Sequence, residues 1–464
     1  MVQLRREQRT SWKSVIPRKQ RRMVAGGAIG TLMEYYDYYL YGLAAATVFP
    51  TVFFPNQSIT VGTIEAFASF AFGFLLRPIG GIVFGHIGDR KGRKTALMIT
   101  VIGMGISTAA IGLIPSAATI GVAAPILLLV FRMLQGLFVG GEMGSAASLV
   151  VEHAPVGRRG LFGALLISGA GIANVASAGF MAAVDGSHSF FITWGWRIPF
   201  VFALVLTIVA VVLRSKLEES EEFKEHTATI ALKQAKRKFP LKEVFRHPKN
   251  TILGILIGLP QSIAGYLVLT FGLAFMVSKG TAAKVGFIGA MIVGVMQVFA
   301  APLWGGLSDK IGRRKTYIGG CIAFALLLYP TFALYSTNIA VLIWLGMIIG
   351  FVIPGVAMQA TLQTMLCEMF DVEARTTGVN IGYQISNTLG GGFAPLIAVA
   401  LTAAFGSVLP VIIYAAVIAL IGIVATAYAS FRPDVENAGR LHELEVTRGG
   451  SPVSHTRPPA FQSQ

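Results

Sequence analysis

Long apolar stretches, separated by short polar segments, dominate the sequence. Each stretch has the roughly 20 residues that a helix needs to cross a hydrocarbon core about 30 Å thick. None alternates apolar and polar positions over a long run, so helices are expected rather than strands. The twelve predicted spans are 23–47, 63–85, 96–115, 122–150, 160–183, 194–213, 251–277, 285–307, 317–336, 339–366, 377–404 and 408–430.

Basic residues occur as short islands on alternate sides of these spans. One side holds 33 of the 38 lysines and arginines, whereas the loops on the other side hold only Arg197, Lys279 and Lys284. Because loops rich in lysine and arginine stay in the cytoplasm, both termini and the central loop are expected there. The basic segment 1–22 leads into a run that is too long for a signal peptide and contains two acids, so an uncleaved first span is expected.

Composition supports a membrane protein. The chain is 54% hydrophobic and 13% charged, which excludes an ordinary soluble enzyme, a disordered chain and a disulfide-stapled module. A net charge of +16 would suit a nucleic-acid binder, but the basic residues do not cluster on one domain. Cys321 and Cys367 are expected to be reduced structural thiols. The sequence contains no HExxH motif, no paired Cys/His ligands and no Walker-type phosphate loop, so we expect neither an enzyme nor a metal or cofactor.

The sequence repeats itself once. GHIGDRKGRKT at 85–95 matches GGLSDKIGRRKT at 305–316, and the aspartates of the two motifs are 220 residues apart. A second repeat has a glutamate, six residues and an arginine, with an offset of 216: Glu152 with Arg159, and Glu368 with Arg375. Two homologous halves that suit alternating access are therefore expected. The predicted parts are a basic cytosolic N-terminus (1–22), an N-terminal half (23–213), a cytosolic linker (214–250), a C-terminal half (251–430) and a disordered cytosolic tail (431–464).

These motifs carry a resemblance to a known family. The Gly-x-x-x-Asp-x-x-Gly-Arg-basic loop in both halves resembles the signature of the major facilitator superfamily, and Arg132, Gln135 and Gly136 resemble its second motif. Within that superfamily, six segments are similar to the metabolite:proton symporter family: EYYDYYLYG at 34–42, RPIGG at 77–81, GGEMG at 140–144, WGWRIPF at 194–200, EESEEF at 218–223 and GYQISNTLGGGFAP at 382–395. Tyr35 and Met143 depart from it, because each stands where this family usually has Trp.

The resemblance implies an all-α membrane protein with twelve transmembrane helices in two pseudo-symmetric six-helix halves, the major facilitator fold. It implies a monomeric proton-coupled symporter of the cell (inner or plasma) membrane. The solute would be a small organic acid or zwitterion, with a shikimate-like metabolite as the first candidate. A proton-coupled antiporter or exporter is the alternative within the superfamily, although span 5 (160–183) has no proline where drug antiporters carry a Gly-Pro element. A membrane receptor or channel is the alternative from another class.

Five ionisable residues fall well inside the predicted spans, away from their ends: Glu34, Asp37, Arg77, Arg132 and Glu142. A charge at the bilayer centre costs about 2.5–3.5 kcal/mol, so these groups must pair, become neutral or line a wet cavity. Three acids and two arginines leave one acid over, which is a candidate proton carrier. We expect Asp37 to be the main proton site, with Glu34 and Glu142 next. The alternative is a buried ion-pair scaffold without a transport role, in which Arg77 and Arg132 serve as braces.

The second half offers neutral polar groups instead, since its spans contain no charged residue before Glu368. We therefore expect the first half to handle the proton and the second half to bind solute hydroxyls or carboxylates. The alternative for the neutral groups is polar contact between helices. The candidate substrate-binding residues are Tyr38, Tyr41, Gln135, Gln261, Tyr383, Gln384 and Asn387.

The repeated loops predict a cytosolic gate. Asp89 and Asp309 each end a span at a glycine turn, where an aspartate can face the positive N-terminus of a neighbouring helix. The resemblance implies that basic residues of these loops pair with glutamates at the same membrane level and hold the cytosolic side closed. The remaining gate candidates are Arg93, Lys94, Glu152, Arg159, Arg313, Arg314, Glu368 and Arg375.

Overall fold

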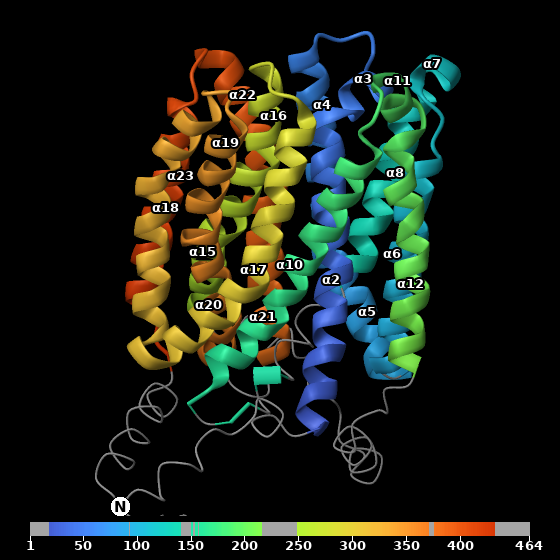
Figure 1. Ribbon diagram of the computed structural model, residues 1–464. Coiled ribbons are helices and arrows are strands. Elements are labelled where there is room, and N and C mark those ends of the chain that lie inside the picture. Colours follow the sequence, from blue (N-terminus) through green and yellow to red (C-terminus); the bar gives the residue numbers. More distant parts are fainter. Residues whose placement is uncertain are drawn as a thin grey trace, which may run out of the picture.

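The computed structural model describes residues 18–91, 93–140, 150–151, 154–155, 157–215, 248–370 and 375–431. Within these ranges every regular element is a helix, and the long helices run side by side along one direction (Figure 1). The expected all-α architecture is confirmed for this part of the chain.

The N-terminal half is built from the first six spans and the short helices between them. Its helices are α2 (Arg18–Thr47), α3 (Phe49–Phe53), α4 (Ile59–Leu75), α5 (Arg77–Lys91), α6 (Arg93–Leu113), α7 (Ala117–Ile120), α8 (Ala123–Val139), α10 (Arg159–Val184), α11 (His188–Phe190), the π-helical η2 (Phe191–Gly195) and α12 (Arg197–Ser215).

The C-terminal half contains three π-helical segments between its α-helices. Its elements are α15 (Pro248–Gly265), η3 (Tyr266–Phe271), α16 (Gly272–Ser278), α17 (Ala283–Ile311), α18 (Arg313–Tyr335), α19 (Ala340–Met347), η4 (Ile348–Val352), α20 (Pro354–Met369), α21 (Arg375–Ser386), η5 (Asn387–Gly392), α22 (Ala394–Phe405) and α23 (Leu409–Tyr428).

The helices have the lengths expected for a membrane. Among the described residues, ten helical segments are long and apolar enough to cross one, and α8 is a shorter apolar helix. Predicted span 122–150 is described only as far as residue 140 and again at 150, so residues 141–149 lie outside the described ranges. The outer surface is apolar: Leu303 is 73% exposed, Leu326 69% and Phe299 67%. Such side chains suit contact with lipid tails rather than water.

A glycine turn ends α17 in the second of the repeated loops. Gly312 has φ of 98°, a conformation that glycine adopts without steric cost, and α18 begins at the next residue. This geometry agrees with the tight glycine turn that the GGLSDKIGRRKT motif predicts.

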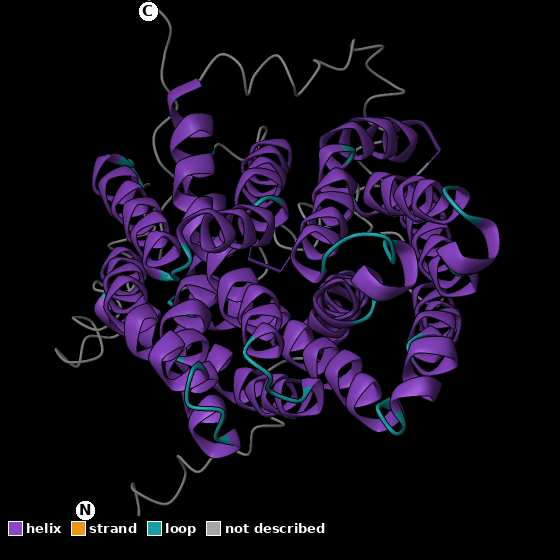
Figure 2. Ribbon diagram, turned by 90° about the horizontal axis from the view of Figure 1, so that it is seen from above, coloured by secondary structure: helices purple, strands orange, loops and turns teal. Residues whose placement is uncertain are grey.

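The two halves meet most extensively where α10 packs along α17. Viewed from above, the helices form two adjacent groups (Figure 2). Glycines allow the two backbones to touch: a methyl group added at Gly171 would lie 2.8 Å from the carbonyl oxygen of Gly294. Other contacts between the halves join α2 with η3 and α16, and α4 with η5 and α22. The helices that meet between the halves are therefore those that carry the polar residues considered next.

Candidate functional site

A buried charge pair lies inside the N-terminal half. Asp37 of α2 and Arg132 of α8 are 2% and 1% exposed, and the Nη1 atom of Arg132 lies 3.9 Å from the Oδ2 atom of Asp37. Both side chains therefore lie within the protein and do not contact lipid. Burying a single charge is costly, and the attraction between Asp37 and Arg132 offsets part of the cost of burying each of them.

Thr108 of α6 joins this pair to a third helix. Its hydroxyl donates to Asp37 Oδ1 at 2.5 Å and to the carbonyl oxygen of Met104 at 2.8 Å, and it accepts from Gln135 Nε2 at 2.9 Å. The Oε1 atom of Gln135 accepts in turn from Arg132 Nη1. Because one hydroxyl hydrogen serves two acceptors, a change at Asp37 can redirect it toward the Met104 carbonyl. The carboxyl group of Asp37 is thus connected to α6 and α8 at once.

A second buried group contains the other acid of α2. The hydroxyl of Tyr38 donates to Glu34 Oε1 and accepts from Arg77 Nη1. The guanidinium carbon of Arg77 also lies 3.5 Å from the ring centroid of Phe74 and 4.1 Å from that of Tyr38. Such stacking stabilises a guanidinium out of water. Arg77 begins α5 directly after α4 ends at Leu75, so a helix break positions it.

Aromatic rings also surround Arg132. Its guanidinium carbon lies 4.2 Å from the ring centroid of Tyr41 and 4.7 Å from that of Phe70. The hydroxyl of Tyr41 is 2.7 Å from Ser69 Oγ. Four of the five predicted ionisable residues are therefore buried in the N-terminal half. The fifth, Glu142, lies outside the described residues.

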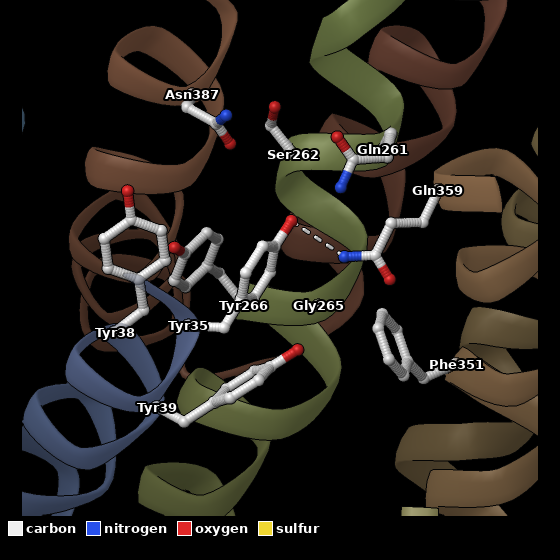
Figure 3. Close-up of a pocket in the computed structure, with 10 residues that line it drawn as sticks. All are labelled: Tyr35, Tyr38, Tyr39, Gln261, Ser262, Gly265, Tyr266, Phe351, Gln359 and Asn387. Carbon is white, nitrogen blue, oxygen red and sulfur yellow. Dashed lines mark hydrogen bonds between the residues drawn. The ribbon is translucent and has the colours of Figure 1, made fainter. Parts of the chain in front are cut away.

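A cavity lies between the halves (Figure 3). Three tyrosines of α2 line it from the N-terminal half, and π-helical segments or their neighbours contribute the rest. The lining residues are Tyr35, Tyr38, Tyr39, Gln261, Ser262, Gly265, Tyr266, Phe351, Gln359 and Asn387. None of these side chains carries a formal charge at neutral pH, so the lining offers phenol hydroxyls, amides and aromatic faces.

The cavity is closed in this conformation. Its volume of about 20 Å³ has room for roughly one water molecule. Drug-sized ligands occupy clefts of about 300–1,000 Å³. The halves must therefore separate before a metabolite can enter.

A chain of hydrogen bonds crosses the cavity from one half to the other. Gln297 Nε2 of α17 donates to Gln359 Oε1 of α20 at 2.7 Å, and Gln359 Nε2 donates to the hydroxyl of Tyr35 at 2.9 Å (Figure 3). The same hydroxyl lies 3.0 Å from that of Tyr383 in α21. Tyr35 of α2 thus connects with two helices of the C-terminal half.

The predicted substrate-binding residues are divided between these two regions. Tyr38, Gln261 and Asn387 line the cavity, and Tyr383 lies behind it, bonded to Tyr35. Tyr41 and Gln135 belong instead to the network around Arg132. Gln384 is 2% exposed, and its amide has no hydrogen-bond partner among the described residues.

Most of the cavity lining, and the link from Thr108 to Asp37, are not among the residues predicted from the sequence. The lining residues outside the candidate substrate-binding list are Tyr35, Tyr39, Ser262, Gly265, Tyr266, Phe351 and Gln359. Tyr35 stands out in the sequence only as a departure from the family pattern, at a position that could face the substrate. A signal was present for some of them, because Tyr266 and Gln359 are polar residues within predicted spans. Thr108 gave no such signal, since a threonine within an apolar run often bonds only to its own helix.

At the end of the bundle where α17 ends and α10 begins, Asp309 accepts hydrogen bonds from the other half. Its Oδ1 and Oδ2 atoms receive the backbone N–H groups of Gly160 and Leu161, at 2.8 and 2.9 Å, at the start of α10. Arg313 lies 3.1 Å from Asp309 and 3.1 Å from Glu368. The expected contact of Asp309 with a helix N-terminus and the expected Arg313–Glu368 pair are both present. Their role as a gate stays a prediction.

Other gate candidates differ or lie beyond the description. We expected Arg314 to pair with a glutamate, but its described contacts are different. Its Nη2 atom donates to the carbonyl oxygen of Ala429 at 2.6 Å, and its guanidinium lies over the ring of Phe431. Arg314 follows Arg313 by one residue and so points about 100° away around α18. The backbone carbonyl of Arg159 accepts from Thr364 at 3.3 Å. Glu152 and the side chains of Asp89, Arg93, Lys94 and Arg375 lie outside the described part.

Comparisons with known proteins agree with this architecture. The family described as "Sugar (and other) transporter" matches residues 23–235, and "Major Facilitator Superfamily" matches residues 251–457. The shikimate transporter of Escherichia coli (strain K12) is 38% identical over 392 residues, which are 83% of this chain and 89% of that protein. The proline/betaine transporter of Salmonella typhimurium is 35% identical over 420 residues, 88% of this chain and 82% of that protein.

Solved structures share the fold. The crystal structure of a D-xylose-proton symporter superposes with a TM-score of 0.68 at 19% sequence identity, covering 90% of this chain and 98% of that one. This likeness confirms the predicted fold class, with twelve helices in two halves.

Proposed function

The chain belongs to the major facilitator superfamily, and we propose that it is a proton-coupled symporter. Membership is the premise of this proposal, because proteins of this superfamily are membrane transporters of small metabolites rather than enzymes. We propose that it imports a small organic acid or zwitterion, with a shikimate-like metabolite as the first candidate. The two halves would expose the cavity to each side of the membrane in turn.

The position of Asp37 on the same helix as the cavity tyrosines is the observation that carries this proposal. Asp37 contacts Arg132 and Thr108 within the N-terminal half. Tyr35, Tyr38 and Tyr39 of the same helix face the cavity instead. A proton on Asp37 would remove the negative charge that faces Arg132 and would change the hydrogen bonds of Thr108. Because these contacts hold α2 against α6 and α8, protonation and solute binding would act on one helix.

The lining and the relatives support the solute class. Phenol hydroxyls and amides suit the hydroxyl and carboxylate oxygens of a small ring acid, and aromatic faces suit its carbon skeleton. The named relatives transport shikimate and proline or betaine. Arg77 lies one hydrogen bond behind the lining, through Tyr38, and would stabilise a carboxylate there.

The location follows the same reasoning. A relative in Escherichia coli is named an inner membrane metabolite transport protein, and we propose the corresponding membrane for this chain. The basic loops favour a cytoplasmic location for both termini, and we include this orientation in the proposal. A monomer suffices, since one chain provides both halves of the cavity.

Proton movement in liposomes tests the proposal. The purified chain would be reconstituted, and shikimate or proline would be added outside while the external pH is recorded. Symport removes protons from the medium with the solute and makes it more alkaline, whereas antiport makes it more acidic. Solute entry without any change in pH would point to a uniporter or channel and would contradict proton coupling. A thermal-shift screen against organic acids and betaines at two pH values identifies the solute to use.

A further inference from the structure

We propose that the hydroxyl of Tyr35 takes the place of a solute oxygen, so that the two halves can close around the cavity when no metabolite is carried. This inference rests on the proposed alternating-access function. It assigns to Tyr35 a role in solute selection and in the return of the empty transporter.

The contacts of the Tyr35 hydroxyl differ from those of three other tyrosines on α2. The hydroxyls of Tyr36, Tyr38 and Tyr41 bond within the N-terminal half, to Pro199, to Glu34 and Arg77, and to Ser69, respectively. The hydroxyl of Tyr35 instead meets Gln359 Nε2 at 2.9 Å and the Tyr383 hydroxyl at 3.0 Å. It therefore links α2 to α20 and α21 across the boundary between the halves.

Burial makes these contacts necessary for closure. Tyr35, Gln359 and Tyr383 are 7%, 4% and 1% exposed, and the cavity has room for only about one water molecule. A buried amide donor without an acceptor is costly. Gln359 already uses its oxygen to accept from Gln297, so its Nε2 needs an acceptor in front of it. Tyr35 provides that acceptor in the closed conformation.

The same contacts restrict the solute. A group that displaces the Tyr35 hydroxyl must accept from the amide of Gln359 and also bond to the hydroxyl of Tyr383. A hydroxyl or carboxylate oxygen can do both, whereas a trimethylammonium group offers no acceptor. We therefore expect the solute to present such an oxygen toward α20 and α21.

The kinetic consequence separates two modes of transport. Net uptake requires the empty transporter to close and reorient, but exchange of solute for solute does not. Loss of the Tyr35 hydroxyl should slow net uptake and leave solute exchange unchanged. During exchange the solute itself supplies the oxygen that accepts from the amide of Gln359.

The test compares Tyr35→Phe with Tyr36→Phe, which removes a hydroxyl from the next residue but breaks a contact within one half. Net uptake and exchange of radiolabelled shikimate would be measured in liposomes. We expect Tyr35→Phe to lower net uptake about fivefold or more, the effect of roughly one hydrogen bond, while exchange stays within about twofold. Equal losses in both modes, or no loss in either, would overturn the inference.

A measurement without solute keeps this test separate from the proposed function. Ser262 lines the cavity, and a Ser262→Cys protein that also carries Cys321→Ala and Cys367→Ala reports access through its alkylation by N-ethylmaleimide. With Tyr35→Phe in this background, the closed state should be less populated. Alkylation of the cysteine at position 262 should then be about fivefold faster than with Tyr36→Phe. An unchanged rate would refute the role of Tyr35. Absence of shikimate transport by the unmodified chain would instead contradict the proposed solute.

Discussion

The carboxylate of Asp37 is shared between Arg132 and Thr108. Its Oδ2 atom lies 3.9 Å from the guanidinium, which permits attraction without a short hydrogen bond, and its Oδ1 atom receives the threonine hydroxyl at 2.5 Å. The acid is therefore held by one charged and one neutral contact, on two different helices. Protonation of Asp37 would weaken its attraction to the Arg132 guanidinium more than its hydrogen bond with Thr108.

Asp37→Asn should uncouple transport from the proton gradient. The amide is nearly the same size but does not ionise, so uptake should no longer rise when the outside is made more acidic. In the unmodified chain, accumulation should increase with external acidity, because protonation precedes inward movement. Solute exchange at equal pH should persist in the variant. Accumulation that still follows the pH gradient would exclude Asp37 as the proton site.

Thr108→Val should disconnect Asp37 from Gln135 with little change in shape. Two buried polar groups lose a partner, and we expect a loss of about 1–3 kcal/mol in stability. Thermal unfolding in detergent, together with uptake at several pH values, would measure the effect. Thr108→Ser keeps the hydroxyl and should behave like the unmodified chain. If valine is as well tolerated as serine, the hydroxyl has no role in holding Asp37.

Gly171→Ala should force α10 and α17 apart. The added methyl group would lie 2.8 Å from the Gly294 carbonyl oxygen and 2.9 Å from the backbone nitrogen of Val298, which are atoms that cannot move independently. Overpacking of this kind costs about 1–3 kcal/mol. Gly179→Ala is the matched control, because on the same helix its nearest neighbour is Met291 Sδ at 3.6 Å. Thermal unfolding should separate the two, and equal midpoints would contradict the tight contact.

Asp309→Ala should destabilise the closed state at the end of the bundle that we expect to face the cytoplasm. It removes both acceptors at the start of α10 and one partner of Arg313, which corresponds to about 0.5–2 kcal/mol. Thr364 is fully buried at this boundary, so alkylation of Thr364→Cys should accelerate in the variant. Lys310→Ala, an exposed change in the same turn, should leave the rate unaltered. Equal rates in the two variants would mean that Asp309 does not hold the gate.

The sequence predicts the spans well because twenty apolar residues have few alternatives to a membrane helix. The sequence also identified Asp37 and Arg132 as candidate functional residues. A charged residue within an apolar span is rare, because burying a charge is costly, and it is therefore easy to recognise. The glycine turn before Arg313 could be predicted for a similar reason, because the residue type reflects the backbone conformation.

The cavity could not be predicted in the same way. Tyr35 and Tyr38 differ little as residues in a run of tyrosines, and only the position of the C-terminal half determines that one bonds across the boundary and the other within its own half. Regular α-helical spacing would put Asn380, Gln384 and Asn387 in one polar stripe on a single helix face. Asn387 begins the π-helical η5, which changes the direction of the residues that follow.

The small volume of the cavity has a consequence for the energy supply of the cell. Water molecules in single file conduct hydrogen ions, and a continuous file needs far more space than the single molecule that fits in the cavity beside Tyr35 and Gln359. In the closed conformation this cavity therefore cannot hold a continuous file of water. For the symporter proposed above, this closed cavity would add no leak to the proton gradient that drives uptake.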